Sequence, residues 1–383
     1  MKICFLHTVA IDPQKGGIEK ISSLLADALA ARGNEVFYLS MMDVFRENCD
    51  RERQFFFPDS SAIYSAKNEA FLKNFLRDKK IDCVIFQAGD DKRVPFPQLY
   101  SQCGARLIVA VHTDPEYYRA VVRNKIVMKY GERFAKAFPC FVALKTFLRS
   151  RKHKKIYRGN AMAADAVVLL SQKFVPAFAK YIRPADRQKI TAIPNFVNPP
   201  ADVPADKARE LLYVGRMNID EKRVDLLLRI WAKLQSAFPQ WRLRLVGDGS
   251  DRERLQRLSR ELAVERVSFE GFQNPENYYR NAAIFCLTSA FEGFGLAMVE
   301  AASYACVPVA FNSYASAEEI ISDGENGFLV PAFDTDAYAG TLARLMADEN
   351  LRRRLSVAAR GNAGRFSLPT TVARWETLFE KII

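Results

Sequence analysis

The chain has 383 residues, which exceeds one ordinary core and predicts two domains. Hydrophobic residues make up 49% and charged residues 26%, as is typical of a soluble globular protein, and no apolar run approaches the roughly 20 residues of a membrane span. The net charge is +12, and the seven cysteines and three histidines form no CxxC or CxxH cluster, so we expect no metal site, no disulfide framework and a reducing, cytoplasmic compartment.

The first half of the chain alternates apolar strands with helices. Strands are expected at 2–7, 35–39, 82–87, 106–112, 166–171 and 190–193, and helical segments at 18–31, 97–103 and 174–181. Strands that alternate with helices at this spacing predict a parallel, doubly wound sheet.

A proline-rich linker then precedes a second alternating region. Prolines stand at positions 194, 199, 200 and 204. Beyond them, strands are expected at 211–214, 241–247, 267–270, 284–287, 307–311 and 327–330, with helices at 223–238, 252–263, 296–304, 334–347, 350–363 and 369–382. The predicted division is a first domain at 1–197, a second at 205–366, and a last helix within 367–383 that could cross back to the first domain.

One strand-to-helix corner carries the most informative pattern. Glu292-Gly293-Phe294-Gly295 precedes the predicted helix, and Glu300 lies within it. The free N–H groups near residues 294–296 would face outward at the positive end of the helix dipole, which favours an anionic group. The two glutamates would repel phosphate but could accept hydrogen bonds from hydroxyl groups on either side of it. A nucleotide sugar has this order of groups (ribose, diphosphate, hexose), whereas two ordinary surface glutamates are the alternative.

Other loops at strand ends of the second domain carry compatible chemistry. Arg216 and Lys222 follow one strand, and paired cations suit a diphosphate and its departure. Gly271 and Phe272 follow another strand, where backbone groups and an aromatic ring could hold a base. Exposed loops with solvated charges are the alternative for each feature taken singly.

Residues 115–158 hold most of the net charge, with 13 Lys or Arg against two Glu. Aromatic and aliphatic side chains lie between these cations, a mixture typical of an interfacial membrane-binding element and less suited to nucleic acid. A pair of solvated helices is the alternative. The residues expected to meet an anionic membrane surface are Phe138, Phe141, Phe147, Arg149, Arg151, Lys152, Lys154 and Lys155.

Together these segments resemble the retaining glycosyltransferases of family 4. The shared motifs are GRM-x3-EK from Gly215, VGDG from Val246, EGFG-x4-E from Glu292, EEIISDGENGFLV from Glu318, and the GGIEK opening from Gly16. The resemblance covers almost the whole chain outside roughly residues 42–80 and 115–158. It implies the α/β GT-B fold, in which two doubly wound Rossmann-like domains face each other across a cleft. Ser313–Ala317 departs from the family's glycine-rich turn, which could reshape the donor-sugar pocket.

The resemblance also implies roles for individual residues. Arg216 and Lys222 would hold the diphosphate, and the backbone of Phe294, Gly295 and Leu296 would bind its distal phosphate. Glu300 would accept the ribose hydroxyls, and Glu292 would meet hydroxyls of the donor sugar. His112 would lie near the reacting sugar carbon, although a strand-end histidine bonded to backbone is the alternative. Gly16 and Gly17 would let the first loop approach the donor or the acceptor.

The expected function is that of a metal-independent retaining hexosyltransferase. It would use a nucleotide sugar, expected to be UDP-linked, as a substrate, with no cofactor. The acceptor would be a lipid-linked or lipopolysaccharide-type glycan at the inner face of the cell membrane, where the basic segment attaches the protein peripherally. The alternatives are a nucleotide-sugar epimerase of similar fold and a non-catalytic membrane-associated scaffold.

Overall fold

The structure is a computed structural model that describes residues 1–13, 16–44 and 49–383. Its backbone forms two compact units. Unit 1 comprises Met1–Glu116, Ala143–Asn195 and Leu368–Ile383, and unit 2 comprises Tyr117–Val142 and Phe196–Ser367. The unit boundary near Asn195 falls at the start of the proline-rich linker.

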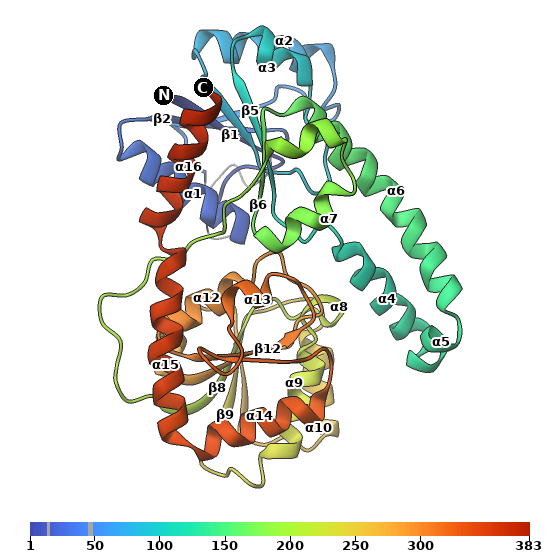
Figure 1. Cartoon of the computed structure of the whole chain (residues 1–383), viewed down its shortest axis with the longest axis vertical. Helices are drawn as coiled ribbons and strands as arrows, with labels where there is room; N and C mark the ends of the chain where they lie inside the picture. Colours follow the sequence, from blue (N-terminus) through green and yellow to red (C-terminus); the bar gives the residue numbers. More distant parts are fainter. Residues whose placement is uncertain (14–15, 45–48) are drawn as a thin grey trace. The chain divides into compact units, whose positions relative to one another are not determined.

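Unit 1 contains a parallel sheet of seven strands in the order β3-β2-β1-β4-β5-β6-β7 (Figure 1). The central strands are apolar on both faces and, apart from Lys2 and Arg106 at the starts of β1 and β5, buried, as a sheet covered by helices requires. Chain order reverses between β1 and β4, so the loops after their carboxyl ends lie at a topological switch point. The strands are β1 (Lys2–His7), β2 (Glu35–Ser40), β3 (Gln54–Phe56), β4 (Cys83–Phe86), β5 (Arg106–Val111), β6 (Ala166–Leu169) and β7 (Ile190–Ala192).

The helices of unit 1 include the last helix of the chain. Helix α16 packs beside α1, and Arg32 forms an ion pair with Glu376 (Figure 1). The C-terminal helix therefore belongs to unit 1. The α-helices are α1 (Gly17–Ala30), α2 (Ala66–Asp78), α3 (Pro97–Gln102), α6 (Pro139–Ala163, whose first turn is grouped with unit 2), α7 (Val175–Ala179) and α16 (Leu368–Ile382).

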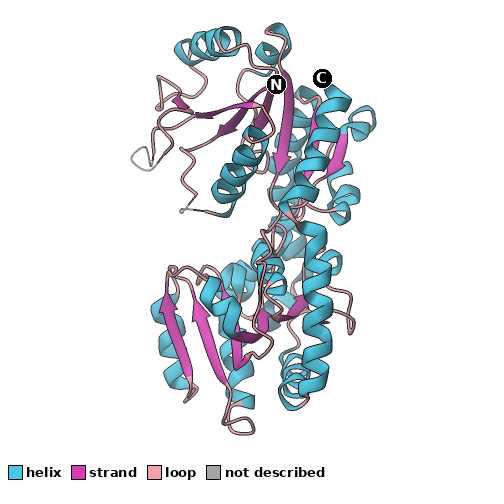
Figure 2. Ribbon diagram, turned by 90° about the vertical axis from the view of Figure 1, so that its left-hand side faces the viewer, coloured by secondary structure: helices cyan, strands magenta, loops and turns pink. Residues whose placement is uncertain are grey.

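Unit 2 contains a parallel sheet of six strands in the order β10-β9-β8-β11-β12-β13. Figure 2 shows strands flanked by helices in this unit, as in unit 1. The strands are β8 (Ala208–Val214), β9 (Arg242–Val246), β10 (Val267–Gly271), β11 (Ala282–Leu287), β12 (Val307–Asn312) and β13 (Phe328–Pro331). Two parallel, doubly wound sheets confirm the predicted fold class.

Helices of several lengths complete unit 2. The longer ones bury apolar faces, as α9 does with Leu227, Ile230 and Trp231. They are α4 (Tyr117–Tyr130), α5 (Glu132–Ala137), α8 (Ile219–Lys222), α9 (Val224–Leu234), α10 (Arg252–Glu261), α11 (Glu276–Asn281), α12 (Leu296–Ser303), α13 (Ala317–Ile320), α14 (Thr335–Ala347) and α15 (Glu349–Ala363).

The basic segment 115–158 is divided between the units, whereas the sequence analysis placed all of it in the first domain. It folds into α4, α5 and most of α6. The Asn124 side chain donates a hydrogen bond to the Asp220 carbonyl oxygen at 2.9 Å, and the ring of Tyr117 lies 5.8 Å from that of Phe291. These contacts join Tyr117–Val142 to unit 2. They could not be predicted from the spacing of residues along the chain.

Candidate functional site

The first turn of α12 lies at the EGFG corner. Gly295 is its N-cap residue, with φ of 89° in the left-handed region that favours glycine, and no side chain caps the helix. The preceding Phe294 is buried against Phe366, with ring centroids 5.3 Å apart. The first-turn N–H groups of a helix have no intrahelical acceptor, so they and the helix dipole favour an anionic group at this point.

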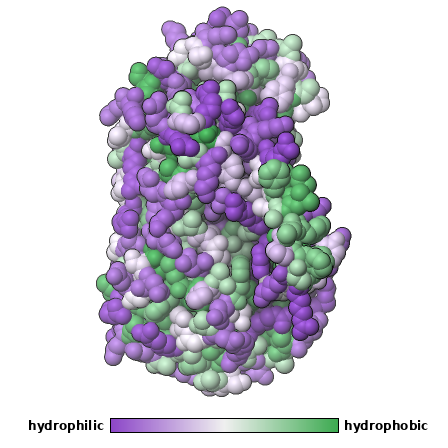
Figure 3. Space-filling model, turned by 45° about the vertical axis from the view of Figure 1, so that its right-hand side comes forward, coloured by the Kyte–Doolittle hydropathy of each residue, from purple (hydrophilic) through white to green (hydrophobic). Residues whose placement is uncertain are grey.

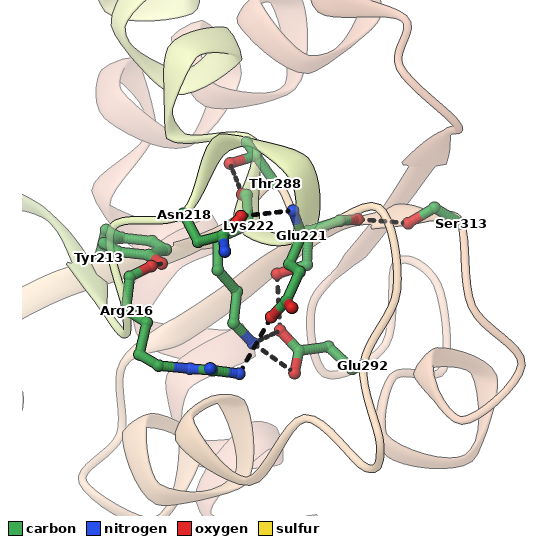
Figure 4. A network of polar contacts seen from close by, with 9 residues as sticks. Tyr213, Arg216, Asn218, Glu221, Lys222, Thr288, Glu292 and Ser313 are labelled. Atoms are coloured by element: carbon green, nitrogen blue, oxygen red, sulfur yellow. Dashed lines mark hydrogen bonds and ion pairs between the residues drawn. The ribbon is translucent and has the colours of Figure 1, made fainter. Parts of the chain in front are cut away.

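Lys222 and Glu292 form the central polar contact beside this turn (Figure 4). The Lys222 ammonium donates to both Glu292 carboxylate oxygens, at 2.7 and 2.8 Å. Ser289 Oγ donates to Glu292 Oε1 at 2.6 Å, so the carboxylate accepts three hydrogen bonds from two donor groups. The lysine side chain is 16% exposed and that of the glutamate 11%, which shields the ion pair from much of the solvent.

Arg216 lies in the same network but is far more exposed. Its guanidinium Nη2 donates to Glu221 Oε2 at 2.9 Å, and its side chain is 72% exposed. An exposed ion pair of this kind contributes little to stability, about 0–1 kcal/mol, because water competes for both charges. The guanidinium can therefore exchange Glu221 for a ligand phosphate at low cost.

The backbone around Arg216 is held by its own loop contacts. Tyr213 Oη donates to the Arg216 carbonyl at 2.8 Å, and burial together with the charge of Glu292 raises the pKa of this phenol. The Met217 N–H donates to the Asp248 carbonyl at 2.8 Å. A Cβ at Gly249 would stand 2.6 Å from the Met217 carbonyl oxygen, so the VGDG turn needs glycine to pack against this loop.

Glu300 lies in the second turn of α12. Tyr279 Oη donates to its Oε2 at 3.1 Å, and Tyr279 is buried. Burial and the Glu300 charge together raise the pKa of Tyr279, so the phenol stays protonated and holds the carboxylate in place as a hydrogen-bond donor. The glutamate retains acceptor capacity, because an ionised carboxylate has about four lone-pair sites.

The turn that departs from the family pattern contacts the loop that bears Glu292. Ser313 Oγ donates to the Ser289 carbonyl at 2.6 Å. Tyr314 Oη and Ser316 Oγ are buried and have no hydrogen-bond partner within the described part of the chain. The Tyr314 oxygen lies 3.5 Å from the point where a Gly295 Cβ would stand. The serine-rich turn thus brings the Tyr314 hydroxyl beside the start of α12.

Gly271 and Phe272 lie at the end of β10, on the edge of the unit 2 sheet. The Gly247 N–H donates to the Gly271 carbonyl at 2.7 Å, which joins this strand end to the VGDG turn. The Phe272 side chain is 76% exposed, an unusual position for a large aromatic ring. Its face is available for stacking.

His112 and two groups near it occupy the carboxyl ends of β4 and β5 in unit 1. Gln87 Oε1 lies 2.5 Å from His112 Nε2, while Nδ1 is buried with no partner among the described residues. Burial lowers the pKa of His112 to about 4, so the ring is neutral at physiological pH. A Gln87 carbonyl that accepts from Nε2–H leaves the Nδ1 lone pair as an acceptor.

Asp90 is a buried carboxyl group beside this histidine. Its Oδ1 accepts from the Thr113 N–H at 3.0 Å and from the Thr113 hydroxyl at 2.9 Å. Burial raises its pKa to about 6, and the two bonds from Thr113 oppose that shift. Asp90 thereby fixes the backbone immediately after His112.

The glycine pair of unit 1 begins α1. Gly16 is the N-cap residue and Gly17 the first residue of the helix. A Cβ at Gly17 would meet no atom of the described residues within 4 Å, so these residues leave space there.

The residues expected to meet a membrane lie on α6 and just before it. Phe138 and Phe147 are exposed, and Phe141 is half-buried against Phe134, with ring centroids 6.1 Å apart. Figure 3 shows hydrophobic side chains gathered over this region. The five basic residues of the cluster are all exposed on α6: Arg149, Arg151, Lys152, Lys154 and Lys155.

The described residues contain neither a membrane-spanning helix nor a cluster of metal ligands. No helix among them has the length and apolar character needed to cross a bilayer. Nor do three or more of their His, Cys, Asp or Glu side chains gather as metal ligands would.

The structure brings some of the predicted site residues together and adds others. Lys222 and Glu292 are in direct contact, and Arg216 joins them through the same short loop. The sequence analysis did not identify the residues that orient these groups: Gln87, Asp90, Glu221, Tyr279 and Ser289. Glu221 is the glutamate of the GRM-x3-EK motif, to which no role was assigned, and Ser289 stands three residues before Glu292; the sequence offered no other signal for them.

Part of the chain matches a known family model. Residues 198–362 match the family model described as glycosyl transferases group 1. An uncharacterized glycosyltransferase of Haemophilus influenzae is 24% identical over 377 residues, with 94% of this chain and 95% of that protein covered. The amylovoran biosynthesis glycosyltransferase AmsD of Erwinia amylovora is 27% identical over 278 residues, which cover 72% of this chain and 70% of the relative.

One relative is much longer than this chain. An exopolysaccharide phosphotransferase of Streptomyces coelicolor is 30% identical over 227 residues, 58% of this chain, but the chain spans only 24% of its length. The phosphotransferase activity in its name is therefore not assigned to this chain.

Solved structures share the fold along the whole chain. The lipopolysaccharide outer core galactosyltransferase WaaB superposes with a TM-score of 0.73 at 21% identity and covers 100% of both chains. Anabaena HepE, solved with UDP, has a TM-score of 0.73 at 18% identity and also covers 100% of both chains. At these identities the likeness demonstrates the GT-B fold.

Proposed function

We propose that the chain transfers a hexose from a nucleotide sugar to a lipid-linked or lipopolysaccharide-type glycan, because residues 198–362 match the model of the group 1 glycosyl transferases, the fold is GT-B and the motifs resemble those of family 4. One observation carries the donor half of this proposal: Lys222, Glu292 and Arg216 converge in unit 2 beside the uncapped start of α12. Cations and free N–H groups suit a diphosphate, and the neighbouring carboxylate suits sugar hydroxyls.

The donor would extend along this part of unit 2. Its distal phosphate would bind at Phe294, Gly295 and Leu296, with Lys222 and Arg216 on the diphosphate oxygens. Glu300, held by Tyr279, would accept the ribose hydroxyls, and Gly271 with exposed Phe272 would contact the base. We propose uridine as that base, consistent with HepE, which was solved with UDP.

Transfer would form a bond between an acceptor oxygen and the anomeric carbon while the bond from that carbon to the phosphate oxygen breaks. The acceptor proton passes to the departing phosphate, so the products are a glycoside and a nucleoside diphosphate. Attack from the face that the phosphate leaves retains the anomeric configuration. Lys222 and Arg216 would stabilise the charge that develops on the diphosphate, which is the role a metal ion has in other transferases.

Glu292 would position the donor sugar. Its carboxylate already accepts from Lys222 and Ser289, which fixes its orientation and makes it a poor nucleophile. In unit 1, a neutral His112 with an acceptor at Nδ1 suits a sugar hydroxyl, and the space at Gly17 suits a ligand near the first loop.

The acceptor half of the proposal comes from α6 and from the relatives. Exposed Phe147 lies on α6 with five exposed cations, as in elements that lie at a membrane interface. AmsD is named for amylovoran biosynthesis, and WaaB for the lipopolysaccharide outer core. We therefore place this protein at the cytoplasmic face of the cell membrane, attached peripherally, in the synthesis of a surface glycan.

Product analysis tests this function against its alternatives. The protein would be incubated with UDP-hexoses, with and without a lipid-linked acceptor, and the nucleotides separated by chromatography. The proposal predicts nucleoside diphosphate, released slowly by hydrolysis and faster with acceptor. A new nucleotide sugar would indicate an epimerase, and an unchanged donor would indicate a scaffold.

A further inference from the structure

One exposed face of α6 changes from apolar to basic along the helix. Leu144, Phe147 and Leu148 are more than half exposed near its start. Arg151, Lys155 and Arg158 continue the same face at spacings of three and four residues, and all are exposed. The face therefore runs from aliphatic and aromatic side chains to three cations.

The opposite face of α6 attaches the helix to unit 1. His153, Ile156, Tyr157 and Asn160 are buried, and at 100° per residue they lie about half a turn away from the exposed face. The apolar-to-basic face is thus directed away from the core of its unit.

A cavity of about 650 Å³ lies at the basic end of this face. Arg93, Lys155 and Arg158 line it together with Tyr64, Pro97 and Met162, and no carboxylate is among the lining residues. A concave surface can enclose a ligand, and one with three cations and no carboxylate attracts an anion without repelling it.

The walls of the cavity are fixed by hydrogen bonds. Asn160 accepts from the Val94 N–H at 3.0 Å and donates to the Lys92 carbonyl at 2.9 Å, so it attaches the loop that bears Arg93 to α6. Tyr64 Oη donates to the Arg93 carbonyl at 3.3 Å, and its ring packs against Phe96 at 6.0 Å. Arg93 and the α6 cations are therefore placed around one space by the fold.

The three cations have no ion-pair partner within the described residues. Other arginines of the chain do: Arg183 pairs with Asp186, and Arg244 with Glu270. Like charges around one cavity repel each other, and a bound anion would remove that cost.

We propose that this cavity binds the phosphate of an anionic phospholipid headgroup while the apolar end of the same α6 face enters the acyl boundary. Lys155 is about 10 Å along the helix from Leu148 at 1.5 Å per residue, a separation that suits headgroup and acyl levels. The inference rests on the membrane part of the proposed function and adds a defined phosphate site to it. A free phosphate would use the cations but not the apolar end, and for that reason we favour the lipid.

The test compares two double variants of equal charge. Arg93→Gln with Arg158→Gln alters the cavity. Lys67→Gln with Arg254→Gln removes two exposed cations elsewhere, neither of which lines the cavity. Binding would be measured to phosphatidylcholine vesicles with and without phosphatidylglycerol, and to monomeric dihexanoyl phosphatidylglycerol by phosphorus NMR. Inorganic phosphate would be the competitor.

We expect the cavity variant to lose roughly tenfold or more in affinity for phosphatidylglycerol vesicles, since each cation near an anionic surface contributes substantially, and the control variant to lose less than about twofold. The short-chain lipid should bind the parent and the control but not the cavity variant. Equal losses in the two variants would overturn the cavity site, and inorganic phosphate that binds as tightly as the short-chain lipid would overturn the choice of a phospholipid as its ligand. Donor hydrolysis is measured in parallel: its absence in the parent contradicts the proposed function, not the cavity.

Discussion

Lys222 and Glu292 form an ion pair in which one ammonium contacts both carboxylate oxygens, at 2.7 and 2.8 Å. The cation proposed to hold the donor diphosphate is therefore already neutralised by the residue proposed to hold the donor sugar. When a donor binds there, its phosphate would contact Lys222 while Glu292 remains beside that lysine. This arrangement couples recognition of the two halves of one ligand.

The first prediction concerns the two cations. Lys222→Ala or Arg216→Ala should lower turnover about 100-fold or more, because each removes charge stabilisation that grows as the bond to the phosphate breaks. Turnover would be measured as nucleoside diphosphate release. Activity of both variants within a few-fold of the parent would refute their assignment.

A double variant separates catalysis from folding in this experiment. Loss of Lys222 leaves the largely buried Glu292 without its cation, which lowers stability. Glu292→Gln in the Lys222→Ala background should restore the melting temperature but leave turnover well below that of Glu292→Gln alone. Recovery of both would mean that Lys222 acts only through stability.

The second prediction concerns metal ions. If Arg216 and Lys222 supply the positive charge that the leaving diphosphate needs, treatment with EDTA should leave turnover largely unchanged. Initial rates would be compared before and after chelation. Complete loss that magnesium or manganese restores would contradict this assignment.

The third prediction concerns Asp90. Burial raises its pKa in the folded state to about 6, above the value of about 4 expected when unfolded. The folded state thus binds the proton more tightly than the unfolded state. Below about pH 4 the carboxyl group is protonated in both states and lowers stability in neither. Between pH 4 and 6 the free energy of unfolding falls, because the unfolded state releases its proton first, and above pH 6 the loss is complete. The shift of about two pH units corresponds to about 3 kcal/mol.

The measurement for Asp90 is the melting temperature as a function of pH. Asp90→Asn keeps an acceptor for Thr113, so its melting temperature relative to the parent should rise as pH increases from 4 to 7. The exposed neighbour provides the control: Asp91→Asn should change the pH dependence much less. A difference between Asp90→Asn and the parent that does not vary with pH would show that Asp90 titrates normally.

The fourth prediction concerns the membrane. Cys140 is exposed beside Phe138 and Phe141 and provides a site for an environment-sensitive fluorophore. Its emission should shift to the blue on anionic vesicles and recover only in part at high salt, because screening affects the charges and not the apolar contacts. Arg151, Lys152, Lys154 and Lys155 replaced together by Ser should reduce both the shift and transfer to a lipid-linked acceptor.

Donor hydrolysis is the internal control of that experiment. It should survive the quadruple substitution, because the residues proposed to bind the nucleotide lie in unit 2 and the four cations in unit 1. Equal vesicle binding by parent and variant would exclude the electrostatic contribution. Simultaneous loss of hydrolysis would show that α6 serves the stability of its unit.

Much of the fold could be predicted because its strands are short apolar runs bounded by turns. Strand β1 was predicted at its observed bounds, Lys2–His7, and β11 and β12 were located within a few residues. Strand β3 was not predicted, since three residues give too little period to detect. Helix α2 was also missed, although Ser65 caps it and Leu72, Phe75 and Leu76 form its buried stripe.

Residues of the candidate site could be predicted only where they belong to a recognisable sequence motif. Lys222 and Glu292 were singled out separately, yet their direct contact depends on how the loops after β8 and β11 pack, which spacing does not encode. Tyr279 and Gln87 orient Glu300 and His112 from other elements, so no local pattern marks them. The grouping of α4 with unit 2 depends on tertiary contacts of the same kind.

Calorimetric titration of UDP into two glutamate variants tests the proposed donor site most directly. Glu300→Ala should weaken UDP binding, since the ribose hydroxyls lose their acceptor, whereas Glu292→Ala should leave UDP binding nearly unchanged and abolish efficient transfer. Because UDP lacks the hexose, the two glutamates are distinguished by the ligand itself. Unchanged UDP affinity in Glu300→Ala, with weakened affinity in Glu292→Ala, would contradict the proposed position and orientation of the donor.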